Sequence, residues 1–173
     1  MIQKLNAEDF DKIYSIMKES FPPDEHRTYQ EQKELLSNPQ YCIYVLPDFE
    51  AKDIKAFIAV WKFDDFAFIE HFAVNPIYRN SGIGSSMLQE TVKILSCMIC
   101  LEVELPNNEI SKRRIDFYKR NGFYINDYRY IQPPISNGRN PLPLKIMTSG
   151  NEITEDKFNE IKALLYKCVY NVS

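Results

Sequence analysis

The sequence predicts a single mixed α/β domain over residues 1–173, with about seven short strands and helices packed against them. Three observations support this prediction. An apolar strand, a glycine turn and an amphipathic helix follow one another between residues 66 and 95. A second helix ends at a glycine just before another strand, between residues 111 and 131. An amphipathic segment closes the chain after Thr154.

The N-terminal part of the chain alternates between strand and helix patterns. Apolar residues at helical spacing follow Asn6, so we expect a helix there with Asn6 as its N-cap and an end near Pro22-Pro23. The other elements expected here are a strand over 2–5, a short helix over 29–36, strands over 41–46 and 54–63, and a polar turn over 47–53.

The central and C-terminal parts continue this alternation. Residues 66–74 are mostly apolar and few, which is typical of a strand buried on both faces. A helix with one apolar stripe begins near Gly82 or Gly84. The remaining expected elements are a strand over 98–105, a helix over 111–121 with Gly122 as a left-handed cap, a strand over 123–131, a loop over 132–141 and a strand over 142–147.

The chain closes with a helical extension over about 150–173. Thr154 is placed to cap a helix that reaches about Val169. Its apolar face could cover the sheet of its own chain or meet a second subunit, so a homodimer stays open. The face consists of Phe158, Ile161, Leu165, Cys168 and Val169.

Composition excludes several classes of protein. A net charge of −3 and a pI near 5.5 argue against nucleic-acid or anionic-membrane partners. The polar start of the chain is unlike a signal peptide, and no apolar run approaches the ~20 residues of a membrane helix, so we expect a cytoplasmic protein. Cys97 and Cys100 have the spacing of a metal or redox pair, but no second pair exists, so we expect small hydrophobes and no metal.

The turn Arg79-Asn-Ser-Gly82-Ile-Gly84 has the features of a phosphate-binding junction. It joins a strand to a helix, whose first N–H groups and positive dipole end face an anion. It is not a Walker loop, because no Gly-x-x-x-x-Gly-Lys-Ser/Thr run exists. It is not a dinucleotide fingerprint either, because Met87 stands where the third glycine would be.

This turn, with the Phe-Ala-Val that ends the strand before it, resembles the acyl-CoA loop of the GNAT superfamily of N-acetyltransferases. A second segment, Phe117-Tyr118-Lys-Arg-Asn-Gly122-Phe123, is similar to the family's helix that bears a tyrosine before a Gly-Phe strand entry. The two motifs occur in the family's order, and the resemblance covers about residues 1–149. It implies a mixed, mostly antiparallel twisted sheet flanked by helices.

The resemblance implies acetyl-CoA as co-substrate. Its pantetheine arm would meet the backbone of Phe72, Ala73 and Val74. Its pyrophosphate would rest on the N–H groups of Arg79, Asn80, Ser81, Gly82, Ile83, Gly84 and Ser85. Many family members have an asparagine that contacts pantetheine at the position of Ser111. This chain therefore departs from the family pattern there, and Ser111 is the candidate for the contact.

Glu70 is a candidate general base. Alternation places it on one face with Phe66, Phe68, Phe72 and Val74, and burial among them would raise its pKa. The family often has a glutamate on this strand that relays the proton of the amine. An ion pair with a basic residue such as Arg114 is an equally weighted alternative. The neighbouring His71 points to the other face and is expected to be a satisfied core histidine.

Tyr118 is the candidate acid, since the resemblance implies that a tyrosine here protonates the departing CoA thiolate. The alternative is an aromatic core residue. Adjacent helix positions differ by about 100°, so we expect Phe117 in the core and Tyr118 in the cleft.

The acceptor would be a primary amine of unidentified nature. The resemblance places it between the 21–29 connection and the 132–143 loop, where the candidates are Asp24, Glu25, His26, Tyr29 and Arg139. Two other functions stay open. One is a CoA-binding sensor or scaffold without transfer activity, and the other is a site for a different phosphate ligand.

Overall fold

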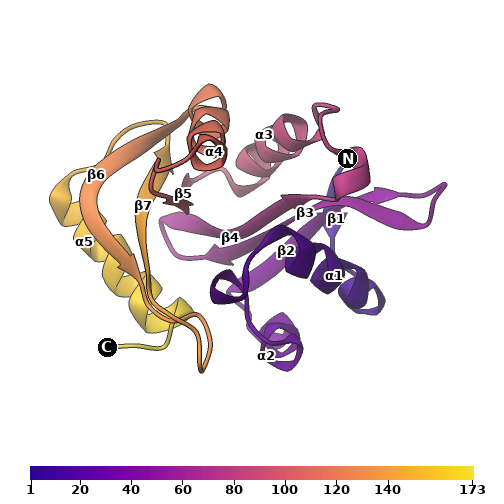
Figure 1. The fold of residues 1–173 in the computed structure, drawn as a ribbon, viewed down its shortest axis with the longest axis horizontal. Helices are drawn as coiled ribbons and strands as arrows, with labels where there is room; N and C mark the ends of the chain where they lie inside the picture. The colour runs from indigo at the N-terminus through magenta and orange to yellow at the C-terminus, as the bar shows by residue number, and fades with distance from the viewer. The chain divides into compact units, whose positions relative to one another are not determined.

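The computed structural model describes all residues 1–173, and the chain divides after Cys97 into two compact units, Met1–Cys97 and Met98–Ser173 (Figure 1). The single domain expected over the whole chain stays a prediction. No helix in the structure has the length and apolar character needed to cross a membrane.

The first unit is an antiparallel sheet with helices on both faces. Its strands lie in the order β1 (Gln3–Lys4), β2 (Tyr41–Asp48), β3 (Asp53–Lys62) and β4 (Phe66–Val74). One face is covered by α1 (Phe10–Ser20) and α2 (Tyr29–Glu34), and the other by α3 (Ile83–Leu95) (Figure 1). The central strand β3 is almost wholly buried, which explains its near-continuous apolar sequence.

A bulge interrupts β4. Ala59 and Val60 are neighbours on β3, yet their partners on β4 are His71 and Ile69, so Glu70 is the extra residue. Cross-strand partners share a face of the sheet, and Ala59 and Val60 lie on opposite faces. Ile69 and His71 therefore also lie on opposite faces, which a regular strand would not allow.

The bulge corrects one expectation from the sequence. Regular alternation placed Phe66, Phe68, Phe72 and Val74 on one face together with Glu70. The pairing of Phe72 with Ile58 and of Val74 with Ala56 instead puts these two on the face opposite Phe68, which pairs with Trp61. The physical reason is the extra residue, which reverses the faces of all positions after it.

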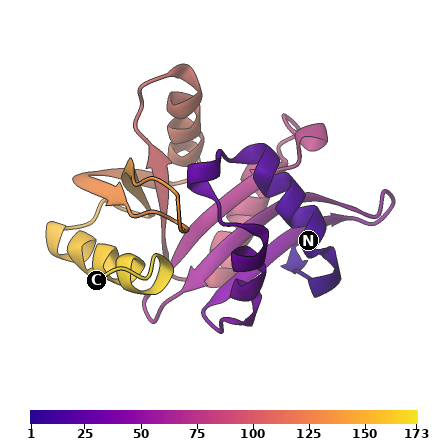
Figure 2. The ribbon, with the colours of Figure 1, turned by 60° about the horizontal axis from the view of Figure 1, so that its bottom comes forward.

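The second unit is a three-stranded antiparallel sheet with two helices. Its strands lie in the order β5 (Met98–Glu104), β7 (Leu142–Ser149) and β6 (Phe123–Gln132). The helix α4 (Glu109–Arg120) connects β5 to β6. The helix α5 (Glu155–Leu164) runs along β6 (Figure 2), where the ring of Phe158 contacts those of Tyr128 and Tyr130.

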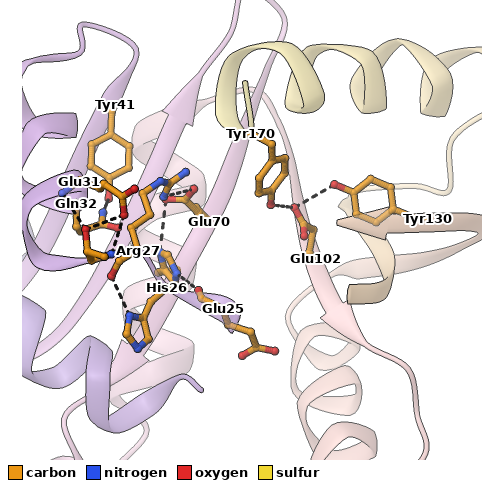
Figure 3. A network of polar contacts seen from close by, with 12 residues as sticks. Glu25, His26, Arg27, Glu31, Gln32, Tyr41, Glu70, Glu102, Tyr130 and Tyr170 are labelled. Atoms are coloured by element: carbon orange, nitrogen blue, oxygen red, sulfur yellow. Dashed lines mark hydrogen bonds and ion pairs between the residues drawn. The ribbon is translucent and has the colours of Figure 1, made fainter. Parts of the chain in front are cut away.

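The C-terminal extension is bonded to β5 through a carboxylate. After α5 the chain makes a π-helical turn over Leu165–Val169. The hydroxyl of Tyr170 then donates to Glu102 Oε1, and Tyr130 donates to the same oxygen at 3.2 Å (Figure 3). Burial and then this carboxylate raise the pKa of Tyr130 well above its usual value. The end of the chain is thus held by a directed polar contact as well as by apolar packing.

Most expected elements are present within a few residues of their predicted bounds. Asn6 makes no side-chain cap, because a 3-10 turn over Ala7–Asp9 separates it from α1. The tail helix has its predicted N-cap, since Thr154 accepts from the N–H of Lys157. Of its expected apolar face only Cys168 is not buried.

Gly122 is predicted to be required for its backbone conformation. Its φ is +83°, whereas a Cβ there would meet nothing within 4 Å, so the demand is conformational rather than steric. Gly122→Ala should lower the free energy of unfolding by about 1–2 kcal/mol, and Gly122→Asn by less, because asparagine tolerates this region better. Urea unfolding measures this, with the exposed Lys119→Ala as control. Equal stability of all four proteins would contradict it.

Candidate functional site

The strand-to-helix junction after β4 has the backbone geometry of an anion site. Gly82 is the N-cap of α3 with a φ of +79°, and no side chain caps the helix. A Cβ at Gly82 would meet nothing within 4 Å, so glycine serves the left-handed conformation. The first N–H groups of this 13-residue helix carry the positive end of its dipole. The junction therefore has the chemistry that a phosphate requires.

Hydrogen bonds from side chains of this turn to nearby backbone carbonyls stabilise it. Arg79 Nε donates to the carbonyl oxygen of Val74 at 3.1 Å, and Ser81 Oγ donates to the carbonyl of Tyr78 at 2.5 Å. The hydroxyl of Tyr78 donates to Asp48 Oδ2 at 2.7 Å, and this hydrogen bond raises the pKa of Tyr78 to about 12. The Arg79 side chain thus points back to the end of β4, which leaves backbone N–H groups as its contribution to an anion site.

Glu70 lies in a buried ion pair. Its Oε1 is 2.7 Å from Nη1 of Arg27, and the two side chains are 2% and 6% exposed (Figure 3). The alternative of an ion pair, weighed from the sequence, is therefore the arrangement found, with a different partner. Arg114, the partner suggested there, is on α4 and pairs with Glu104 at 2.9 Å.

The expectation that the pKa of Glu70 is raised was wrong. Burial does act to raise it, but the Arg27 charge and the contact with His71 act more strongly together and lower the pKa to about 2. The sequence showed the burial of the strand and could not show the guanidinium that compensates it. A lowered pKa makes a carboxylate a weaker general base near neutral pH, which counts against that role for Glu70.

His71 is a satisfied core histidine, as expected, but it does not point away from Glu70. Its Nε2 donates to the carbonyl oxygen of Glu25 at 2.6 Å, and Phe21 packs on its ring with centroids 4.9 Å apart. Its Nδ1 lies 3.5 Å from Glu70 Oε2. The bulge explains this, because it directs two successive side chains toward the same connection.

Tyr118 is more buried than expected. The residue is 8% exposed and its ring contacts those of Phe117 and Phe123, whereas Phe117 is half-buried. The expected division, with phenylalanine in the core and tyrosine outside, is thus reversed. Burial raises the pKa of Tyr118 to about 12, and the charge of Arg114 partly offsets this. The phenol therefore keeps its proton at neutral pH.

Ser111 is part of a helix cap. Asn108 Oδ1 accepts from the Ser111 N–H at 2.9 Å, and the Asn108 N–H donates to Ser111 Oγ at 3.3 Å. This capping box begins α4, and Ser111 is 1% exposed. A pantetheine contact at Ser111 stays a prediction, and its hydroxyl already has partners within the cap.

The structure also locates the residues expected to meet the acceptor. His26 is buried, with its Nδ1 3.0 Å from the carbonyl oxygen of Arg27. Tyr29 is exposed and donates to Asp11 at 2.5 Å. Asp24 and Glu25 form a 3-10 turn with Pro23. Sequence reasoning missed Arg27, because a lone arginine between helix patterns carries no signal of its burial.

The Arg27–Glu70 pair makes stability depend on pH. A pKa lowered from 4.5 to about 2 corresponds to about 3 kcal/mol of folding free energy, present above pH 4.5 and lost as the pH falls toward 2. Glu70→Gln lacks this contribution. Its deficit in unfolding free energy against wild type should therefore shrink below pH 4.5, as urea unfolding between pH 7 and pH 3 would show. A deficit that stays constant from pH 7 to pH 3 would contradict this prediction. As a control, Glu50→Gln at an exposed position should have the unfolding free energy of wild type at every pH.

Comparisons with known proteins agree with this geometry. A model of the acetyltransferase (GNAT) family matches residues 10–123. A solved structure from Bacteroides thetaiotaomicron, described as an acetyltransferase of the GNAT family, superposes with a TM-score of 0.90 at 34% identity, covering 100% of this chain and 99% of that one. No functionally curated protein sequence matches the chain.

More distant structures share the fold alone. The ribosomal-protein-S18-alanine N-acetyltransferase of Escherichia coli has a TM-score of 0.66 at 20% identity, covering 90% of this chain and 96% of its own. A variant of the spermidine N-acetyltransferase SpeG of Vibrio cholerae has a TM-score of 0.64 at 16% identity, covering 86% and 94%. The expected fold class is confirmed, and the family match together with the 34% identical relative shows that this chain belongs to the GNAT acetyltransferase family.

Proposed function

We propose that this protein transfers the acetyl group of acetyl-CoA to a primary amine by direct attack within a ternary complex. The observation that carries the proposal is the start of α3, where Gly82 holds a left-handed turn and no side chain caps the helix. A cap would occupy the N–H groups that a pyrophosphate needs. Membership of the GNAT family supplies the reaction class.

The chain's own backbone would hold the co-substrate. We assign the pyrophosphate to the N–H groups of residues 79–85 and the pantetheine arm to the backbone of Phe72–Val74 at the end of β4. The bond from Arg79 to the Val74 carbonyl supports this assignment, because it links the two segments and keeps a bulky side chain off the turn.

The reaction forms one bond and breaks another. The nitrogen of the neutral amine attacks the thioester carbon, a C–N bond forms, and the C–S bond breaks with its electron pair left on sulfur. An alkyl amine titrates near ~10.4, so about one molecule in a thousand is neutral at pH 7.4. The pKa of Glu70, about 2, makes it unsuitable to take the amine's proton. We infer that the ammonium proton goes to solvent before the attack, and that the second proton, which the nitrogen loses as the C–N bond forms, goes to solvent as well.

Tyr118 would stabilise the departing thiolate. Its pKa of about 12 exceeds the ~8.5 of a thiol, so complete proton transfer from phenol to sulfur would be uphill. A hydrogen bond from the phenol to the thiolate needs no such transfer. We therefore assign Tyr118 the role of hydrogen-bond donor to the leaving group, while solvent supplies the final proton.

The acceptor is proposed to meet the 21–29 connection before α2. Its acidic residues Asp24 and Glu25 would attract a cationic amine. Spermidine and a protein alanine are named for the distant structures, which shows the range of acceptors that this fold serves.

The alternative is a CoA-binding sensor or scaffold without transfer activity. The capping box favours it, because Ser111 replaces the family's asparagine and its hydroxyl is bonded within α4. Thiol release from acetyl-CoA with a panel of polyamines, amino acids and peptide N-termini separates the two. Stabilisation against heat by acetyl-CoA without turnover for any amine would favour the module. No stabilisation by CoA would contradict both.

Tyr118→Phe should lower kcat by about 10- to 100-fold, the usual value of one hydrogen bond to a charged group. Binding of acetyl-CoA, measured by titration calorimetry, should change little, because the phenol acts after the thiolate begins to form. Tyr124→Phe, which removes a half-exposed phenol on β6, should leave kcat unchanged. Wild-type turnover in Tyr118→Phe would remove this residue from the mechanism.

The pH profile should follow the acceptor rather than the enzyme. Without a protein base, kcat/KM for the amine rises about tenfold per pH unit until the amine's own pKa. Two acceptors of different pKa should therefore level off at different pH values in steady-state assays. A bend near pH 6–7 shared by all acceptors would show a titrating base on the protein.

A further inference from the structure

Two successive residues of the β4 bulge hold the 21–28 connection between α1 and α2. Glu70 binds the side chain of Arg27 at 2.7 Å, and His71 binds the backbone carbonyl of Glu25 at 2.6 Å. We call Glu25, Arg27, Glu70 and His71 the clamp, and Figure 3 labels the first three of them. The first contact is an ion pair with a side chain of the connection, and the second is a hydrogen bond to its backbone. Both the main chain and one side chain of the connection are therefore held by β4.

Further contacts immobilise Arg27. The hydroxyl of Tyr14 on α1 donates to the Arg27 carbonyl at 2.9 Å, and His26 Nδ1 lies 3.0 Å from the same oxygen. Tyr41 lies close enough to the pair for the charges of Glu70 and Arg27 to act on its pKa, which burial raises well above the usual value. Its hydroxyl accepts a hydrogen bond from Gln32 Nε2 at 2.6 Å. The backbone carbonyl of Arg27 is thus bonded to α1 and to His26, while its guanidinium meets Glu70 of β4.

A buried ion pair is a poor way to gain stability alone. Removing two charges from water costs about as much as their attraction returns, and apolar residues of similar volume often serve equally well. An ion pair differs from an apolar contact in being directional, because a guanidinium meets a carboxylate in a few geometries. The clamp therefore has more value for fixing one conformation of the connection than for holding the sheet together.

We propose that Arg27 and Glu70 are positioning residues that fix the 21–28 connection on the β4 bulge, so that the acceptor amine meets it in one geometry. This inference rests on the proposed function for the identity of the acceptor site. Neither residue touches the reacting atoms. Asp24 lies next to the clamped Glu25 on the same 3-10 turn, so the clamp sets where its carboxylate stands.

The clamp can be tested without an acceptor. In Arg27→Met the pair is broken, and hydrogen exchange measured by mass spectrometry should become at least about 10-fold faster in peptides covering residues 21–28. Peptides covering 79–95 should exchange as in wild type. Arg129→Met, which removes an exposed arginine on β6, should change neither. Unchanged exchange over 21–28 in Arg27→Met would overturn the proposal.

The kinetic test separates positioning from general stabilisation. Arg27→Met should raise KM for the amine at least about fivefold and leave KM for acetyl-CoA within about twofold, while Arg27→Lys keeps part of the effect. Glu70→Gln should lower kcat/KM by the same factor at every pH from 6 to 9. A deficit of Glu70→Gln that grows toward low pH would instead identify it as a base and overturn the proposal.

Arg27→Met leaves Glu70 buried without its partner, so the variant could fail to fold. The double variant Arg27→Met/Glu70→Met removes both charges and should fold, yet still show the raised amine KM. Wild-type exchange and KM in the double variant would overturn the positioning role. If the wild type acetylates no amine, the proposed function fails, and the exchange experiment still decides whether the clamp exists.

Discussion

The position of the connection before α2 depends on the attraction between Arg27 and Glu70. Both charges lie out of water, so separating them would leave each without compensation, and the fold must keep the connection before α2 on the bulge of β4. The same strand continues into Phe72–Val74 and then into the left-handed turn at Gly82. The proposed supports of the acceptor and of the thioester therefore begin at one point of the backbone, a few residues apart.

Much of the fold could be predicted from the sequence because local rules decide it. The apolar run over 66–74 is a strand in the structure with the same bounds, and Gly122 has the positive φ expected of a left-handed cap. The bulge could not be predicted. An extra residue in a strand leaves no periodic mark, because the register becomes visible only when the facing strand is known.

The sequence predicted the backbone path of the strand-to-helix junction better than the side-chain contacts around it. Arg27 was missed because its partner lies on a distant strand, and a charge on an apolar strand indicates a partner without naming it. Phe117 was expected in the core and Tyr118 outside it, and the structure has the reverse. Only one of two adjacent helix residues can point fully into the core, and here it is Tyr118, whose ring contacts Phe123. Ser111 was judged by its place in a family motif, and the local cap with Asn108 was overlooked.

The extra residue in β4 also changes what a deletion means for this chain. Removing Glu70 would take away the bulge as well as a charge. Ile69 and His71 already pair with neighbouring residues of β3, so the ladder would become regular and the side chains from His71 to Val74 would keep their faces. A substitution at this position alters one side chain and keeps the bulge, whereas a deletion removes the bulge and leaves the pairing of the following residues possible. By contrast, a deletion at any paired position of the strand would shift the register. Alignment gaps placed at residue 70 in relatives would therefore mark a change in the architecture of β4 as well as in its chemistry.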